Sequence, residues 1–181
     1  MAKSNRVNDQ KLRELILYVA RASEQDEHFG ATKLNKILFY ADFWAYRKLG
    51  HSITGQQYQK LGKGPAPRRL VPVVRKMEEK GDCVVAQREY FGRTQKVLLS
   101  RREPDLALFS GTEIAIVHDV LERLRSLNAT DVSELSHQFI GWQLAEEGED
   151  IPYSTALLGH PRPPTPAEIE HGRKLAEEMG G

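Results

Sequence analysis

Six histidines and one cysteine are the side chains best suited to metal binding or nucleophilic chemistry, and their spacing forms no motif for either. None of the histidines stands in an H-x-x-x-H or H-E-x-x-H arrangement. The lone Cys83 excludes every paired-cysteine zinc motif, and within an apolar segment we interpret it as an inert core residue. The histidines are His28, His51, His118, His137, His160 and His171. We therefore expect no metal and no cofactor.

Enzymatic activity is not expected either. Catalytic Ser, His and Asp groups meet only in the fold, so spacing alone does not test for them, but no nucleophile-elbow motif is present. The segment Gly62–Gly64 contains the glycines and lysine of a phosphate-binding loop without the G-x-x-x-x-G-K-[ST] spacing. An enzyme that acts on a small molecule is kept as an alternative, because a pocket with perturbed ionisable groups is not visible in a sequence.

The same segment is better interpreted as a structural turn made by Gly62, Gly64, Pro65 and Pro67. Proline fixes φ and restricts the residue before it, whereas glycine permits backbone shapes closed to other residues. We therefore predict a stiff, shaped turn at this point rather than a flexible linker.

Charge is distributed unevenly along the chain. The net charge is only +1, but residues 60–102 carry 12 Lys/Arg against 4 Asp/Glu, and residues 103–181 carry 5 against 15. Such polarity either steers a charged partner to one face or holds the two halves of the protein together.

Composition favours one soluble domain in a reducing, cytoplasmic setting. The 181 residues are 40% hydrophobic and include one cysteine. No apolar run approaches the ~20 residues needed to span a bilayer, and the N-terminus has no apolar signal-peptide core. We expect no membrane association.

Periodicity predicts a mainly α (α+β) fold, a helical domain with a small β-hairpin after the third helix. In the helix at 32–49, capped by Thr32, the core stripe includes Trp44, while Lys33, Lys36 and Asp42 are assigned to the solvent side. Residues 1–160 form the main domain, and residues 161–181 add a proline-rich connection and a C-terminal helix (165–179). The other expected elements are helices at 9–25, 66–80 and 111–127, a hairpin at 83–101 tipped by Phe91-Gly92, and a shorter helix that includes Leu135, Phe139 and Trp142.

Two binding hypotheses follow from the surface residues. Three helices and a hairpin are the order of a winged helix, which predicts a DNA-binding repressor as the alternative function. Its phosphate contacts would be Arg68, Arg69, Arg75 and Lys76 on the third helix and Arg88, Arg93 and Lys96 on the wing. For a protein partner, the expected exposed contacts are Tyr40, Tyr46, Tyr58, Lys60, Lys63, Arg68 and Arg69.

Three segments, in order, resemble the SocA-like Panacea domain family of toxin–antitoxin systems. They are KLNKILFYAD (33–42), the segment 53–67 with Tyr58 and Gly64-Pro65, and Ser136-His137 with Trp142. The resemblance spans 12–142. We interpret His137 and Trp142 as packing residues.

This resemblance implies a mostly helical antitoxin of bacterial or phage origin that neutralises a cognate protein toxin by direct binding. The toxin is commonly encoded by the adjacent gene, and one branch of the family hands its toxin to a protease as an adaptor. We expect the second helix, the stiff turn and the basic residues Lys60, Lys63, Arg68 and Arg69 to cover the toxin's functional surface.

Overall fold

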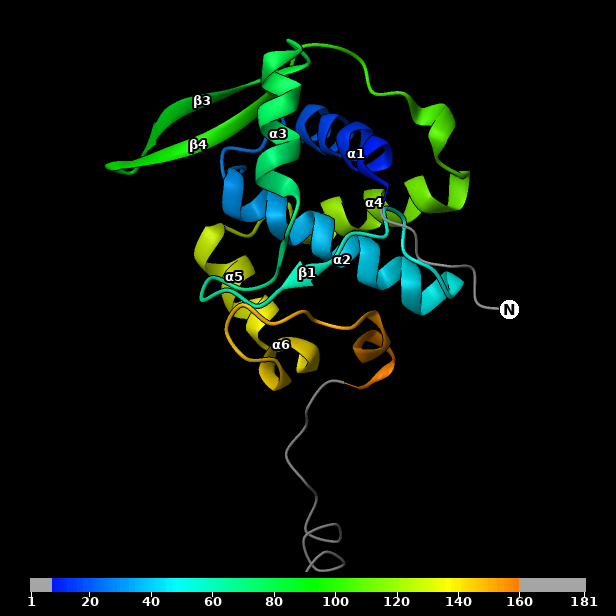
Figure 1. Cartoon of the computed structure of the whole chain (residues 1–181). Coiled ribbons are helices and arrows are strands. Elements are labelled where there is room, and N and C mark those ends of the chain that lie inside the picture. Colours follow the sequence, from blue (N-terminus) through cyan, green and yellow to red (C-terminus); the bar gives the residue numbers. More distant parts are fainter. Residues whose placement is uncertain (1–7, 160–181) are drawn as a thin grey trace, which may run out of the picture.

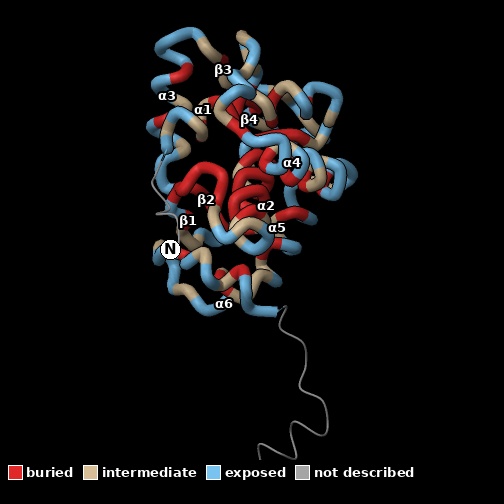
Figure 2. The backbone as a smooth tube through the Cα atoms, turned by 90° about the vertical axis from the view of Figure 1, so that its right-hand side faces the viewer, coloured by how far each residue is buried: buried red, intermediate tan, exposed pale blue. Residues whose placement is uncertain are grey.

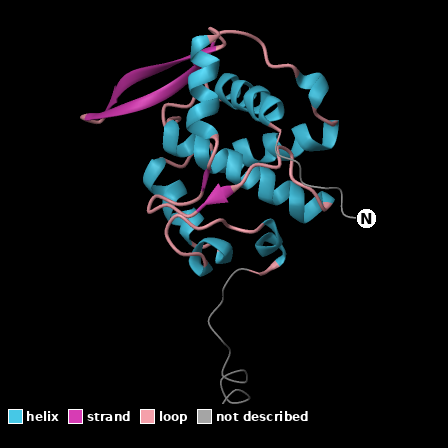
Figure 3. Ribbon diagram, in the orientation of Figure 1, coloured by secondary structure: helices cyan, strands magenta, loops and turns pink. Residues whose placement is uncertain are grey.

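The computed structural model describes residues 8–159 and confirms a mainly helical fold with a β-hairpin after the third helix (Figures 1 and 3). The predicted connection and helix within 161–181 lie outside the described residues. The elements are α1 (Asp9–Ala22), α2 (Ala31–Leu49), β1 (Tyr58–Gln59), β2 (Ala66–Pro67), α3 (Leu70–Glu79), β3 (Cys83–Tyr90), β4 (Arg93–Ser100), α4 (Gly111–Leu124), α5 (Ala129–His137) and α6 (Ile140–Leu144), with short 3₁₀ turns at Leu106–Leu108 and Tyr153–Leu157.

Helix α2 is the centre of the molecule. It packs against α1, α4, α5, β2, β4 and the turn Tyr153–Leu157, and it is buried along most of its length (Figure 2). Its apolar residues serve two cores. One face joins α1 and α4 in the main core, while Phe39 and Phe43 pack with Tyr58 and Ile151 in a second, aromatic cluster. Because it is covered on several sides, α2 has little solvent-facing surface.

Several predicted boundaries were wrong. The N-cap of α2 is Gly30, which has no side-chain cap, so Thr32 does not cap this helix. The third helix begins at Leu70 rather than Ala66, because Ala66 and Pro67 pair with β1. Pro72 then falls in the first turn, where its missing N–H leaves no hydrogen bond unmade.

The remaining elements follow the predictions more closely. The capping box of Ser110 and Glu113 opens α4 as expected, and Gly50 ends α2 in the left-handed conformation. The single short helix expected after α4 is two helices, α5 and α6, separated by Gln138 and Phe139.

The predicted hairpin is confirmed in full. Cys83 pairs with Ser100 and Tyr90 pairs with Arg93, which leaves Phe91-Gly92 as a two-residue turn. Cys83, Val97 and Leu98 are buried near the open end, where β4 packs against α1 and α2. The other end of the hairpin projects beyond the helices (Figures 1 and 3).

The assignment of Lys33, Lys36 and Asp42 to solvent was wrong, since all three are no more than 2% exposed. A buried charge has to find hydrogen-bond partners to compensate for lost water. The Lys33 ammonium donates to Asp26 Oδ2 at 2.6 Å and to the carbonyls of Arg125 and Leu127 at 2.9 and 2.8 Å. It thereby joins the start of α2 to the chain that follows α4.

Asp42 holds the segment between α2 and β1. Its carboxylate accepts from the Thr54 N–H at 2.8 Å, the Thr54 hydroxyl at 2.5 Å and the Tyr58 hydroxyl at 2.6 Å. Burial raises the pKa of Asp42, while these hydrogen bonds oppose the rise. Tyr58 is only 1% exposed, so the expectation that it forms an exposed contact was wrong. It anchors the chain at the entrance to the stiff turn.

Tyr58→Phe is expected to lower the free energy of unfolding by about 2 kcal/mol, because it removes one hydrogen bond from a buried carboxylate. Chemical denaturation measures this change. Tyr46→Phe is the matched control, since it removes a hydroxyl from the same aromatic cluster, in which Tyr46 stacks on Tyr153. Equal stability of the two variants would contradict the anchoring role of the Tyr58 hydroxyl.

Candidate interaction surface

The predicted turn, residues 62–67, is clamped against α2 and α5 and is called here the Gly-Pro turn. Gly64 has a φ of +100°, and a Cβ there would lie 2.2 Å from Ser136 Oγ and 2.7 Å from Lys36 Cε. Only glycine satisfies both the backbone shape and this close approach. The Lys36 ammonium donates to the Pro65 carbonyl at 3.0 Å, and Pro65 and Pro67 are buried. Gly62, in contrast, is exposed with open space around it.

A second set of contacts holds the residues before the turn. The Trp142 indole donates to the Leu61 carbonyl at 3.1 Å, and the Lys60 ammonium donates to the Ala145 carbonyl at 3.0 Å. Lys60 also lies 4.2 Å from the centre of the Trp142 ring, on which His137 stacks at 4.1 Å. The interpretation of His137 and Trp142 as packing residues agrees with these contacts. Lys60 therefore helps to hold the residues that precede the Gly-Pro turn.

Beside the Gly-Pro turn runs a groove of about 760 Å³, called here the basic groove. It is bounded by the hairpin β3–β4, the N-terminal ends of α2 and α5, and Lys63. Its lining residues are His28, Gly30, Ala31, Thr32, Lys33, Lys63, Tyr90, Phe91, Arg93, Thr94, Gln95, Lys96, Asn128, Ala129 and Thr130. The groove thus brings together four chain segments that are far apart in sequence.

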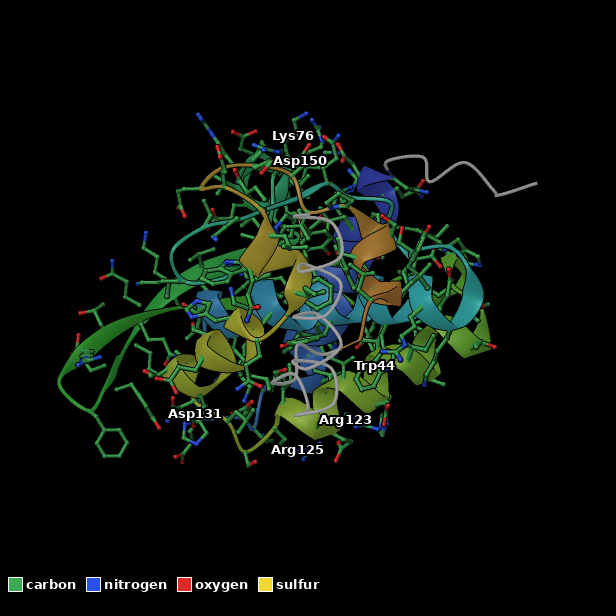
Figure 4. The ribbon with its side chains drawn as sticks, turned by 90° about the horizontal axis from the view of Figure 1, so that it is seen from below. Trp44, Lys76, Arg123, Arg125, Asp131 and Asp150 are labelled. Carbon is green, nitrogen blue, oxygen red and sulfur yellow. The ribbon has the colours of Figure 1, made fainter. Side chains whose placement is uncertain are left out.

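The lining carries positive charge and no carboxylate. Lys33 is compensated by Asp26, but Lys63, Arg93 and Lys96 are exposed and form no ion pair with any residue of 8–159. The N-terminus of α2 adds to this potential, because it has neither a side-chain cap nor an acidic residue in its first turn. Asn128 and Asp131, in contrast, satisfy the N-terminus of α5 (Asp131 is labelled in Figure 4). The groove therefore favours an anionic group.

Two of the predicted binding residues are occupied within the chain. Arg68 forms an ion pair with Asp150 and donates to the Gln59 side chain and the Gly148 carbonyl. Arg69 holds Asp9 through contacts of 2.6 and 2.8 Å, and the hydrogen bond keeps the pKa of Asp9 below its usual range. Charge reversal of this pair would remove internal ion pairs as well as any partner contact.

Among the other predicted residues, Lys63 alone lines the groove. Tyr40 and Tyr46 are half-buried against the aromatic cluster around Phe39 and Tyr153. Trp44 packs partly on the main core, and its ring lies 4.6 Å from the Arg123 guanidinium (Figure 4). The toxin-binding set proposed from the sequence is thus spread over several surfaces.

Two groove residues, Arg93 and Lys96, were assigned from sequence to a nucleic-acid-binding wing, and Phe91 to a hairpin tip; none was placed in a protein-binding surface. The available signal was the charge excess in residues 60–102 together with the hairpin prediction. These residues lie beside the N-terminus of α2 only in the folded chain, so their sequence positions do not reveal the groove.

The described residues form a helical domain with a clamped turn beside a basic groove. Residues 34–143 match the family model described as Antitoxin SocA-like, Panacea domain, and the chain belongs to this family. No curated protein and no solved structure matches the chain. The three segments that carry the resemblance meet at the Gly-Pro turn, through Lys36, Gly64 and Ser136.

Within residues 8–159, no helix combines the length and the apolar character that a bilayer crossing requires. Within the same residues, no group of three or more His, Cys, Asp or Glu side chains is placed to hold a metal ion.

Lys36 is buried against the Gly-Pro turn, and its titration makes the free energy of unfolding depend on pH. Burial lowers the pKa of Lys36 from 10.5 to about 8, so between these values the unfolded chain binds more protons than the folded one. The contribution of the neutral Lys36 amine to the free energy of unfolding is complete above pH 10.5, and it is lost as the pH falls through the folded-state pKa of about 8. Relative to Lys36→Met, the wild-type free energy of unfolding is expected to rise by roughly 3 kcal/mol over this range.

Denaturation at a series of pH values tests this expectation. Lys48→Met serves as the control, because Lys48 is exposed. A wild-type protein whose pH dependence parallels that of Lys36→Met would show that Lys36 titrates normally in the fold.

Proposed function

We propose that this protein is an antitoxin that neutralises a protein toxin by binding it directly, without catalysis. Membership of the antitoxin SocA-like family supports an antitoxin role. The observation that carries the mode of action is the basic groove, which offers three uncompensated cations and no carboxylate among its lining residues. Such a surface fits an acidic face of a partner protein.

The groove has two physical properties that suit this role. Its positive potential accelerates encounter with an acidic partner and disfavours basic ones. The clamped Gly-Pro turn also presents Lys63 from a fixed backbone, which reduces the ordering cost of binding. The proposed partner is the product of the adjacent gene, and the proposed setting is the cytoplasm of a bacterial or phage-infected cell. Delivery of the toxin to a protease would be an additional step after binding.

The winged-helix hypothesis is the alternative. In a winged helix the third helix enters the major groove and requires a positive face. Here the cations Arg75 and Lys76 on α3 are matched by Glu78 and Glu79, and Arg75 pairs with Glu79 at 3.2 Å. Arg68 and Arg69, just before α3, are held in ion pairs with Asp150 and Asp9. This internal pairing around the third helix favours a protein partner over duplex DNA.

Co-expression with the product of the adjacent gene tests the proposal, with growth and co-purification scored together. Growth arrest by the neighbour alone, and rescue with a stable complex, are the expected results. Rescue without a complex would favour repression or enzymatic reversal. A harmless neighbour would remove the toxin assignment, and binding to upstream DNA at several salt concentrations would be measured next.

Reversal of the groove charges by Arg93→Glu/Lys96→Glu is expected to weaken toxin binding by about tenfold or more, with the larger loss at low salt. Titration calorimetry at two salt concentrations measures the effect. Lys80→Glu/Arg101→Glu is the matched control, because it makes the same charge change at exposed residues outside the groove. Equal affinity of the two double variants would exclude the groove as the binding surface.

A further inference from the structure

The tip of the hairpin combines two features that the fold does not require. Phe91 is 89% exposed, the highest value among the large apolar side chains of residues 8–159. It is also the single non-glycine residue in that range with a positive φ, +46°. Exposed aromatic surface and a left-handed backbone both disfavour phenylalanine at this position.

The geometry of the turn favours a residue other than phenylalanine at position 91. Tyr90 pairs with Arg93, and the two residues between them, Phe91 and Gly92, have φ values of +46° and +71°. Two consecutive positive φ values in a two-residue hairpin loop are the signature of a type I′ turn, where Asn-Gly is strongly preferred. Glycine is in its expected place, whereas phenylalanine replaces the residue that would best stabilise the turn. Strain of this kind, when it is observed, points to a functional demand.

The tip is held in place although it projects from the helices. The Tyr90 hydroxyl lies 2.6 Å from His28 Nδ1, and the Arg88 guanidinium donates to the carbonyls of Glu27 and Phe29 at 2.8 and 3.1 Å. The rings of Phe91 and Tyr90 are perpendicular, with 4.7 Å between the ring centres. The aromatic side chain is therefore presented on a supported strand pair, as an interface anchor requires.

The surroundings of the tip indicate the chemistry of its partner. Phe91, Arg93 and Lys96 all line the basic groove, so an apolar anchor and two cations face the same binding region. On the same hairpin, the Glu89 carboxylate accepts from the Thr94 hydroxyl at 2.8 Å. An exposed aromatic side chain beside two cations fits a protein surface that carries an apolar pocket and acidic side chains.

We propose that Phe91 is the anchor of the toxin interface and inserts into an apolar pocket of the toxin that is bordered by carboxylates. This inference rests on the proposed function and names the chemistry of the partner surface. The carboxylates pair with Arg93 and Lys96 on the hairpin, while the phenyl ring fills the pocket between them. Hot spots of this type combine a buried aromatic residue with a charged rim.

The inference predicts that one substitution moves stability and binding in opposite directions. Phe91→Asn places the preferred residue in the type I′ turn, so the denaturation midpoint is expected to rise. The same substitution removes the anchor, and the dissociation constant of the complex with the adjacent-gene product is expected to rise by about 30-fold. Phe91→Trp retains an aromatic anchor and should bind within about threefold of the wild type.

Val71→Asn is the matched control, because Val71 is 78% exposed on α3 and does not line the groove. It should leave the affinity within about twofold of wild type. Wild-type affinity of Phe91→Asn would overturn the anchor while leaving the proposed antitoxin function intact. Failure of the wild-type chain to bind the adjacent-gene product would overturn both. If Phe91→Asn lost binding to upstream DNA rather than to the adjacent-gene product, the tip would be assigned to a nucleic acid.

Discussion

The need to compensate charged side chains buried on α2 determines much of this structure. Lys33, Lys36 and Asp42 lie on a helix covered by other elements on several sides, where an unpaired polar group is costly. Their partners are backbone and side-chain groups of irregular segments: the end of α4, the Gly-Pro turn, and the chain before β1. The helix thus orients three connections that hydrophobic packing alone would leave loosely specified.

The three segments that carry the family resemblance contact one another around the Gly-Pro turn. The first supplies buried cations and a buried carboxylate, the second supplies the Gly-Pro turn, and the third supplies Ser136 and Trp142 against that turn. They support a surface whose outward residues, Lys63, Arg93 and Lys96, are compensated by no other part of the described chain.

Sequence periodicity predicted the helices, the hairpin and its tip because those depend on local spacing. It failed at Lys33, Lys36 and Asp42, because residue type alone assigns a charged side chain to solvent and the partner carbonyls of Lys33 are more than ninety residues away. Arg68 and Arg69 were predicted as partner contacts, and the sequence does not show their ion pairs because Asp150 and Asp9 approach them only in the fold. Lys63, predicted as a contact in the same set, lies on a turn that is specified locally and lines the basic groove.

The attachment of the hairpin has a consequence for how specificity can change. Its open end enters the core through Cys83, Val97 and Leu98, whereas the distal residues Phe91, Arg93, Thr94 and Lys96 are exposed. Substitutions at the distal end therefore leave the packing of α2 undisturbed. Under the proposed function, exchange of a few adjacent codons at the tip is sufficient to change the toxin that is recognised, while the helical scaffold stays the same.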